Sequence, residues 1–176
     1  MSDRQRPPTE AANASRALRS HRLHENSRIF ALKFAIFYQE ITRLQRAMFN
    51  GDLDLFIVAG AIAVGSIESR MRDRDFHDTY ASLESVIGEE MQRGCNASSI
   101  ADATGLPRET VRRRIKRLIE MGIVVRRATG DYVIRAGLVQ SETYSRLFGQ
   151  LSDAVLRLVN DCVEEQVFAV ANGWPK

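Results

Sequence analysis

Apolar residues recur at helical spacing in the first half of the chain. Between residues 26 and 48 they alternate at steps of four and three, which predicts one helix with a coiled-coil-like seam. The seam residues are Phe30, Phe34, Phe37, Ile41, Leu44 and Met48. Asn26 or Ser27 can cap this helix, and Asn50-Gly51 ends it.

Further helices are predicted on both sides of the chain's centre. Asp52 or Asp54 starts one that runs through Ile67 and is rich in Ala and Gly, and Thr79–Met91 is predicted to form another. After a cap at Ser141, a last helix is expected to reach about Ala171. Its seam repeats the four-three alternation at Tyr144, Phe148, Leu151, Val155, Leu158 and Cys162.

The stretch Ser98–Arg135 follows a different pattern. Two short helices meet at a tight turn at Gly105, and Pro107 stands where the second helix begins. Ser98 or Ser99 can cap the first helix, and Ser99 with Asp102 has capping-box spacing. Gly122 ends the second helix, after which Ile123–Val125 and Tyr132–Ile134 predict a hairpin that turns at Thr129-Gly130-Asp131.

The second of these short helices is apolar on one side and cationic on the other. Val111, Ile115, Leu118 and Ile119 recur at the spacing of a core-facing stripe. Six of the eleven residues from Arg108 to Leu118 are basic. A helix anchored on one face and cationic on the other suits the major groove of duplex DNA.

These residues resemble the winged helix-turn-helix of bacterial transcriptional regulators. The order Ala101, Gly105, Val111, Ile115, Leu118 and Gly122-Ile123-Val124 is similar to MarR-type and IclR-type domains, and ADATGLPRETVRR is most similar to IclR-type segments. IclR-type proteins place a large ligand domain after this motif, whereas only 41 residues follow Arg135. The MarR-like layout, with helices on both sides, fits the whole chain better.

The resemblance and the helical pattern together predict a mainly α fold. Three helices and a β-hairpin wing form a winged helix-turn-helix that is flanked by N-terminal and C-terminal dimerisation helices. The expected regions are a disordered basic tail (1–25), an N-terminal dimerisation region (26–72), the DNA-binding domain (78–137) and a C-terminal dimerisation helix (138–172).

Two apolar seams beside one small domain are more apolar surface than a monomer of this size readily buries. A symmetric homodimer covers such surface and matches operators with two-fold symmetry. The alternative is that the two seams pack only on each other within one chain. The predicted dimer interface consists of Phe30, Phe34, Phe37, Ile41, Leu44, Tyr144, Phe148, Leu151, Val155 and Leu158.

The charge distribution agrees with a nucleic-acid partner. The chain has 176 residues and a net charge of only +3, but residues 108–135 hold nine Lys and Arg against three acids. No signal peptide is recognised, and the longest apolar run, Leu55–Val64, is too short to cross a bilayer. A cytoplasmic protein without a membrane partner is therefore expected.

Helical angle assigns roles within the predicted DNA interface. Base contacts are expected from the side opposite the core and its flank, namely Glu109 to cytosine, Thr110 to a thymine methyl, Arg113 to guanine, and Arg114. Phosphate and wing contacts are expected from Arg108, Arg112, Lys116, Arg117, Arg126, Arg127 and Thr129.

Other chemistry has weaker support. No phosphate-binding loop, nucleophile elbow or carboxylate pair with a supporting histidine is present, so neither an enzyme nor a cofactor is expected. His77 among Asp73, Asp75 and Asp78 matches no metal loop, and no metal site is predicted. Cys95 and Cys162 show no disulfide or metal pattern, and a redox role for either thiol stays open.

The sequence therefore predicts a sequence-specific transcriptional regulator, with repression favoured, that binds double-stranded DNA as a homodimer. A small-molecule effector stays open as a further partner. The alternatives are a winged helix that binds protein or RNA, and a DNA-architectural protein without a regulatory role. Protein-binding winged helices usually lack a basic run such as Arg112-Arg113-Arg114.

Overall fold

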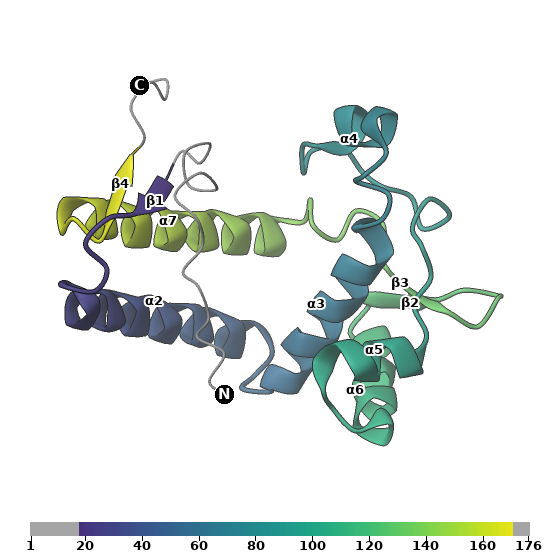
Figure 1. Ribbon diagram of the computed structural model, residues 1–176. Coiled ribbons are helices and arrows are strands. Elements are labelled where there is room, and N and C mark those ends of the chain that lie inside the picture. The colour runs from purple at the N-terminus through teal and green to yellow at the C-terminus, as the bar shows by residue number, and fades with distance from the viewer. Residues whose placement is uncertain (1–17, 171–176) are drawn as a thin grey trace, which may run out of the picture. The chain divides into compact units, whose positions relative to one another are not determined.

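The computed structural model describes residues 18–170. This part of the chain contains six helices and two small antiparallel sheets of two strands each (Figure 1), and the predicted mainly α class is confirmed. The chain divides into two compact units. One contains the chain up to Thr42 and from Gln150 onward, and the other contains Arg43–Gly149.

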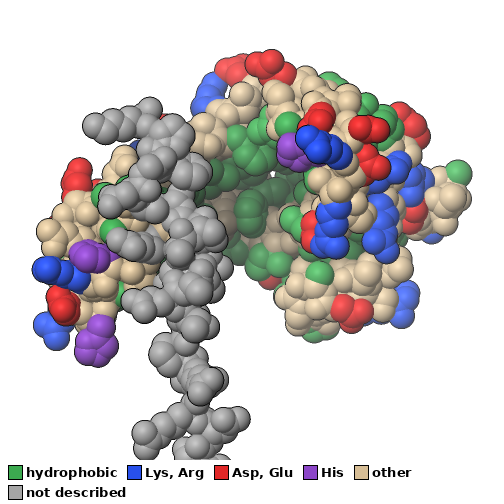
Figure 2. All heavy atoms as spheres, turned by 45° about the horizontal axis from the view of Figure 1, so that its top comes forward, with side chains coloured by type: hydrophobic (Ala, Val, Ile, Leu, Met, Phe, Trp, Pro, Cys, Tyr) green, Lys and Arg blue, Asp and Glu red, His purple; other side chains and the backbone are tan. Residues whose placement is uncertain are grey.

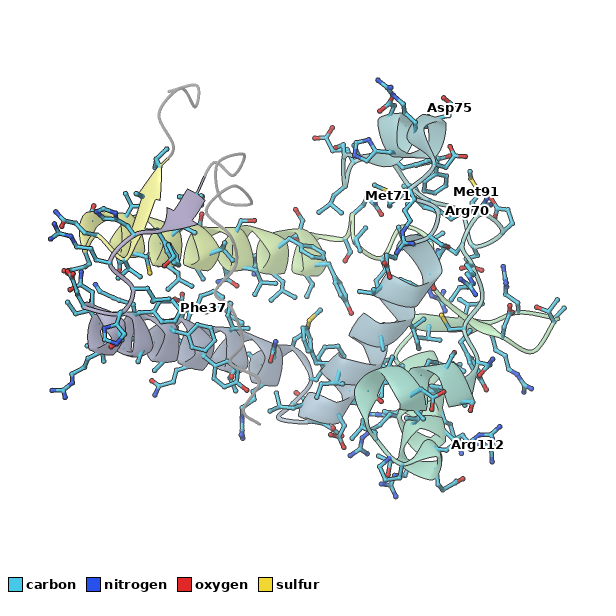
Figure 3. All side chains as sticks on the ribbon, viewed as in Figure 1. Phe37, Arg70, Met71, Asp75, Met91 and Arg112 are labelled. Atoms are coloured by element: carbon cyan, nitrogen blue, oxygen red, sulfur yellow. The ribbon has the colours of Figure 1, made fainter. Side chains whose placement is uncertain are left out.

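The first unit is built on two long helices, α2 (Ser27–Met48) and α7 (Glu142–Glu164), which continue into the second unit. Within the first unit the two helices are linked by ion pairs: Lys33 Nζ lies 2.9 Å from Asp161 Oδ2, and Arg157 Nη2 lies 2.6 Å from Glu40 Oε1. Phe37 points from α2 toward α7 (Figure 3).

A small sheet joins the two ends of this unit. Strand β1 (Leu18–Ser20) pairs antiparallel with β4 (Phe168–Val170). Two expectations are therefore corrected. Residues 18–20 are a strand and not part of a disordered tail, and α7 stops at Glu164 because Gln166 adopts a positive φ of 57° and the chain turns into β4. Residues 1–17 and Ala171 lie outside the described residues.

The apolar side of α7 differs by one position from the predicted seam. Ala154 and Cys162 are buried, and Tyr144, Phe148, Leu151 and Leu158 are partly buried. Val155 was expected on the seam, but it is 46% exposed because Ala154 takes the inward position. The register therefore follows an α-helix of 3.6 residues per turn more closely than a strict heptad.

The second unit has a three-helix core. Helices α3 (Leu53–Ile67), α5 (Ala97–Thr104) and α6 (Arg108–Glu120) pack on one another around a single apolar cluster. Strands β2 (Val124–Arg126) and β3 (Tyr132–Ile134) form the hairpin, and β3 also contacts α3. The cluster is centred on Val58, Ile62, Ile100, Val111, Ile115 and Leu118.

The first helix of this trio is therefore α3 and not the helix predicted over Thr79–Met91. Only α4 (Arg74–Tyr80) is helical in that region, with Asp73 as its N-cap, and residues 81–95 contain no helix. Helix α3 takes the position because it buries Leu55, Val58 and Ile62, whereas residues 79–91 offer no comparable apolar stripe. Residues 53–67, which were expected in the dimerisation region, pack in this core as α3.

The local signals around the turn between α5 and α6 mostly hold. Gly105 adopts the left-handed conformation at φ 70°, and Gly122 does so at φ 73° after α6. The N-cap of α5 is Asn96, which accepts hydrogen bonds from the backbone N–H groups of Ser98 and Ser99. Ser99 completes the capping box from the N3 position, so neither serine is the cap that the sequence suggested.

Candidate nucleic-acid interface

Helix α6 is fixed to the core by one face. Val111 and Leu118 are fully buried and Ile115 is 2% exposed, so the helix cannot rotate without exposing apolar surface. Its opposite side carries exposed Glu109, Arg113 and Lys116, with exposed Arg112 and Arg117 on the two flanks. The predicted apolar face is confirmed at Val111, Ile115 and Leu118, whereas Ile119, which was expected on it, is 36% exposed.

The exposed cations of α6 are only loosely paired. Arg112 Nη1 lies 3.6 Å from Glu109 Oε2, and Arg117 Nη1 lies 3.1 Å from Glu120 Oε2. Both pairs are largely solvent-exposed, where an ion pair contributes about 0–1 kcal/mol. A phosphate can therefore replace either carboxylate at small cost. Arg112 points outward from α6 in Figure 3.

Arg114 has a different role from the one that the sequence suggested. Its Nη2 lies 3.3 Å from Asp52 Oδ2 and 3.3 Å from Asp54 Oδ2, at the start of α3. The side chain is only 23% exposed. Because two carboxylates already hold this guanidinium, Arg114 joins α6 to α3, and we do not assign it to the bases.

A cleft of about 490 Å³ lies between α6 and the turn that joins α2 to α3. Its cationic side is formed by Arg113, Lys116 and Arg117, which α6 presents together. Its other side contains Phe49, Asn50 and Leu55. Asp52 and Glu120 also line the cleft, so its charge is mixed, with the basic side chains in excess.

The hairpin carries two arginines, of which one is exposed to solvent and the other is hydrogen-bonded within the protein. Arg126 is exposed. Arg127 makes a two-point contact with the Asp131 carboxylate, through Nη2 and through Nε at 2.9 Å, and donates to the Gln92 carbonyl at 3.0 Å. Arg127 therefore fixes the hairpin to the segment before α5, and we do not assign it to a phosphate.

Asp131 is the centre of this hairpin network. Hydrogen bonds from Arg127 and from the Thr129 hydroxyl hold the pKa of its carboxyl far below the usual range. The Thr129 hydroxyl donates to Asp131 Oδ1 at 2.6 Å, although the residue is exposed at the hairpin tip as expected. The network sets the shape of the hairpin that carries Arg126.

The segment before α5 extends the hairpin sheet. Cys95 pairs with Tyr132 through two backbone hydrogen bonds of 2.9 and 2.8 Å. Gln92 imitates a further strand residue, because its side-chain amide donates to the Ile134 carbonyl at 2.9 Å and accepts from the Ile134 N–H at 3.0 Å. The sequence analysis did not identify Gln92, because a single buried glutamine adds no position to a repeating apolar pattern.

Two further predicted interface residues lie in the first turn of α6. Arg108 is exposed at the first turn of α6, and Thr110 is partly buried beside it. Figure 2 shows Lys and Arg side chains intermixed with Asp and Glu side chains on the visible face of the molecule.

Neither cysteine has the surroundings of a reactive thiol. Cys95 is 8% exposed and Cys162 is fully buried, and both are free. Burial raises the pKa of the Cys162 thiol, which disfavours the thiolate. Within residues 18–170, no group of three or more His, Cys, Asp or Glu side chains is arranged to hold a metal ion.

Residues 92–125 match a family model described as winged helix-turn-helix DNA-binding. The match covers α5, the turn, α6 and the first two residues of strand β2. It supports a DNA-binding winged helix-turn-helix in this chain, which confirms that part of the sequence analysis. No curated protein and no solved structure matches the chain.

No single helix within the described residues is long and apolar enough to cross a membrane. Helices α2 and α3 reach the required length and composition only as a pair bent by 93°.

Proposed function

We propose that the protein is a sequence-specific transcriptional regulator, and specifically a repressor, that binds a two-fold symmetric operator as a homodimer. The proposal rests on the two faces of α6. Its apolar face is buried in the core, and its opposite face presents loosely paired cations to solvent. A helix held in this way can enter the major groove with defined side chains toward the bases.

Within this proposal, Glu109, Thr110 and Arg113 contact base edges. The cations Arg108, Arg112, Lys116 and Arg117 contact phosphates on both sides of the groove. Arg126, together with Thr129 at the hairpin tip, contacts the backbone or the adjacent minor groove. Neither an enzyme activity nor a cofactor is part of the proposal.

The homodimer is argued from α2. Residues 29–39 contain a single charged side chain, Lys33, and that side chain is paired with Asp161. None of the residues of α2 is buried. A helix that is apolar on most of its circumference is normally covered on most of it. Four large apolar side chains remain exposed, namely Leu32, Phe34, Ile36 and Tyr38.

A second copy of the chain is the occupant that we propose for this surface. The exposed apolar residues of α2 flank, on both sides, the face that this helix turns toward α7. Val155 and Leu156 of α7 are exposed as well. Two copies would therefore bury both helices in a four-helix arrangement. In the resulting MarR-like layout, the dimer forms through α2 and α7, which come from the two ends of the chain. We place the protein and its operator in the cytoplasm.

The test is a selection of bound sites from random duplex DNA with the full chain. The expected result is one enriched sequence in two inverted half-sites, with centres spaced by about one helical turn or a multiple of it. Enrichment of a single half-site would contradict the dimer. Absence of enrichment with equal binding to all duplexes would instead support an architectural protein, and absence of DNA binding would support a protein-binding or RNA-binding module.

A further inference from the structure

Gly94 lies in the segment that extends the hairpin sheet, just before α5. It stands between Gln92, which bonds to the backbone of Ile134, and Cys95, which pairs with Tyr132. The φ angle of Gly94 is not positive, so the backbone conformation does not by itself require glycine. The reason for glycine at this position lies in the space around it.

The ion pair of the hairpin fills the space beside Gly94. A Cβ atom at this position would overlap the Asp131 carboxylate and the Nη2 atom of Arg127. These two groups bond to each other, and the two side chains are only 26% and 24% exposed. The pair therefore packs on bare backbone at Gly94, and a methyl group there would displace it.

This ion pair ties the hairpin to the segment before α5. Through Nη1, Arg127 also donates to the Gln92 carbonyl at 3.0 Å and to the Glu89 carbonyl at 3.3 Å. The two strands of the hairpin have only three residues each. Because so short a two-stranded hairpin is marginally stable by itself, its angle depends on contacts of this kind.

Arg126 is the cation whose position depends on that angle. It is the last residue of β2, directly before Arg127, and it is exposed. Its Nη2 atom lies beside Gly130 at the turn. A hairpin held at one angle presents this guanidinium in one place, so less freedom is lost when it binds a phosphate.

We infer that Gly94 is a positioning residue for DNA binding. By leaving room for the pair of Arg127 and Asp131, it holds the hairpin at the angle at which Arg126 reaches a phosphate. The inference rests on the proposed function, since it requires that Arg126 contacts DNA. Gly94, Arg127 and Asp131 act through the hairpin and do not themselves contact the duplex.

Gly94→Ala separates position from charge, because it leaves every charged side chain in the protein. Fluorescence anisotropy with a labelled random-sequence duplex of about 30 base pairs, long enough for two half-sites, measures the affinity of the full chain. At about 0.1 M salt, Gly94→Ala should weaken binding by about three- to tenfold per subunit, the range expected for one phosphate contact.

Gly60→Ala is the matched control. It makes the same substitution in the same unit, on α3, where an added Cβ meets open space in the described part of the chain. Its affinity for the duplex should equal that of the wild type. Circular dichroism checks that both alanine variants are folded.

A double-mutant cycle with Arg126→Ala tests the route of the effect. In the Arg126→Ala background, Gly94→Ala should weaken binding by less than about twofold, because the side chain that it positions is gone. A domain that is merely destabilised would lose the same factor in both backgrounds. The cycle therefore distinguishes a positioning role from a purely structural one.

Asp131→Asn opens the same ion pair from its other side. It removes a negative charge from the hairpin, so electrostatics alone predicts tighter binding to DNA. The inference predicts weaker binding, because a neutral amide cannot hold Arg127 by charge. This variant keeps the inference testable if Gly94→Ala does not fold.

The inference is overturned if folded Gly94→Ala binds the duplex like the wild type, or if its loss is equal with and without Arg126. Tighter binding by folded Asp131→Asn overturns it as well. In these cases the wild type still binds DNA, so the proposed function stands. If the wild type binds no duplex, the proposed function fails, and the inference fails with it.

Discussion

Arg113 and Arg126 are exposed cations on different elements of the second unit, one on the anchored helix and one on the hairpin. Arg113→Ala should cost about 1–3 kcal/mol per half-site on the preferred duplex and little on a scrambled one. Arg126→Ala should weaken both duplexes by similar factors, because phosphate contacts carry no direct base information. Titrations at one fixed salt concentration measure both. Equal losses for Arg113→Ala on the two duplexes would contradict its role at the bases.

Asp131 predicts an acid-sensitive hairpin. Its folded pKa lies below the value of about 3.9 for an unfolded aspartate, since Arg127 and Thr129 donate to its carboxylate. The stabilisation is thus fully present well above pH 4 and is lost as the pH falls below it toward the folded pKa. Urea unfolding at several pH values between 7 and 2.5 should show Asp131→Asn to be less stable at pH 7 and the difference to shrink in acid. A difference that is constant with pH would contradict the linkage.

Asn96 offers a residue-scale test of the helix-turn-helix itself. Asn96→Ala removes the acceptor of two backbone N–H groups at the start of α5 and should lower the free energy of unfolding by about 0.5–2 kcal/mol. Ser98→Ala is the control, because its exposed side chain is not part of the capping box. Urea unfolding of the two variants compares them. Equal losses would show that the cap contributes nothing specific.

At the scale of elements, the uncovered surface of α2 makes Phe34 the better probe of the dimer. Phe37 points toward α7 of its own chain, whereas Phe34 is 46% exposed. Phe34→Glu should convert a micromolar dimer into a monomer with unchanged helix content, because a carboxylate buried in the interface costs several kcal/mol. Val86→Glu, at an exposed position in the other unit, should leave the dimer intact. Light scattering decides, and a monomeric wild type would refute the proposal.

The whole molecule should show a steep salt dependence on DNA. About five cations per subunit remain for phosphates once Arg114 and Arg127 are assigned to the fold, so a dimer neutralises roughly ten. The affinity for the selected operator should fall about 10³-fold or more between 50 and 200 mM salt. Fluorescence anisotropy with labelled duplex measures this slope. A nearly flat response would indicate a winged helix that uses its charge elsewhere.

The sequence by itself determined the helix-turn-helix, the hairpin and the two long helices. Their signals are local: Gly105 and Gly122 are required by backbone conformation, and Val111, Ile115 and Leu118 recur at the period of one helix. Such features depend on neighbours within a few residues. The structure contains these predicted elements because the tertiary packing buries the same apolar stripe that defines the helix in the sequence.

The tertiary structure decided which helix completes the core and which arginines are free. Helix α3 replaced the predicted Thr79–Met91 helix because only three-dimensional packing shows that its apolar side fits α5 and α6. Arg114 and Arg127 look like their neighbours in sequence, yet carboxylates at residues 52, 54 and 131 hold them. An ion pair between residues 60 positions apart leaves no periodic trace in the chain, since it depends on how separate elements meet.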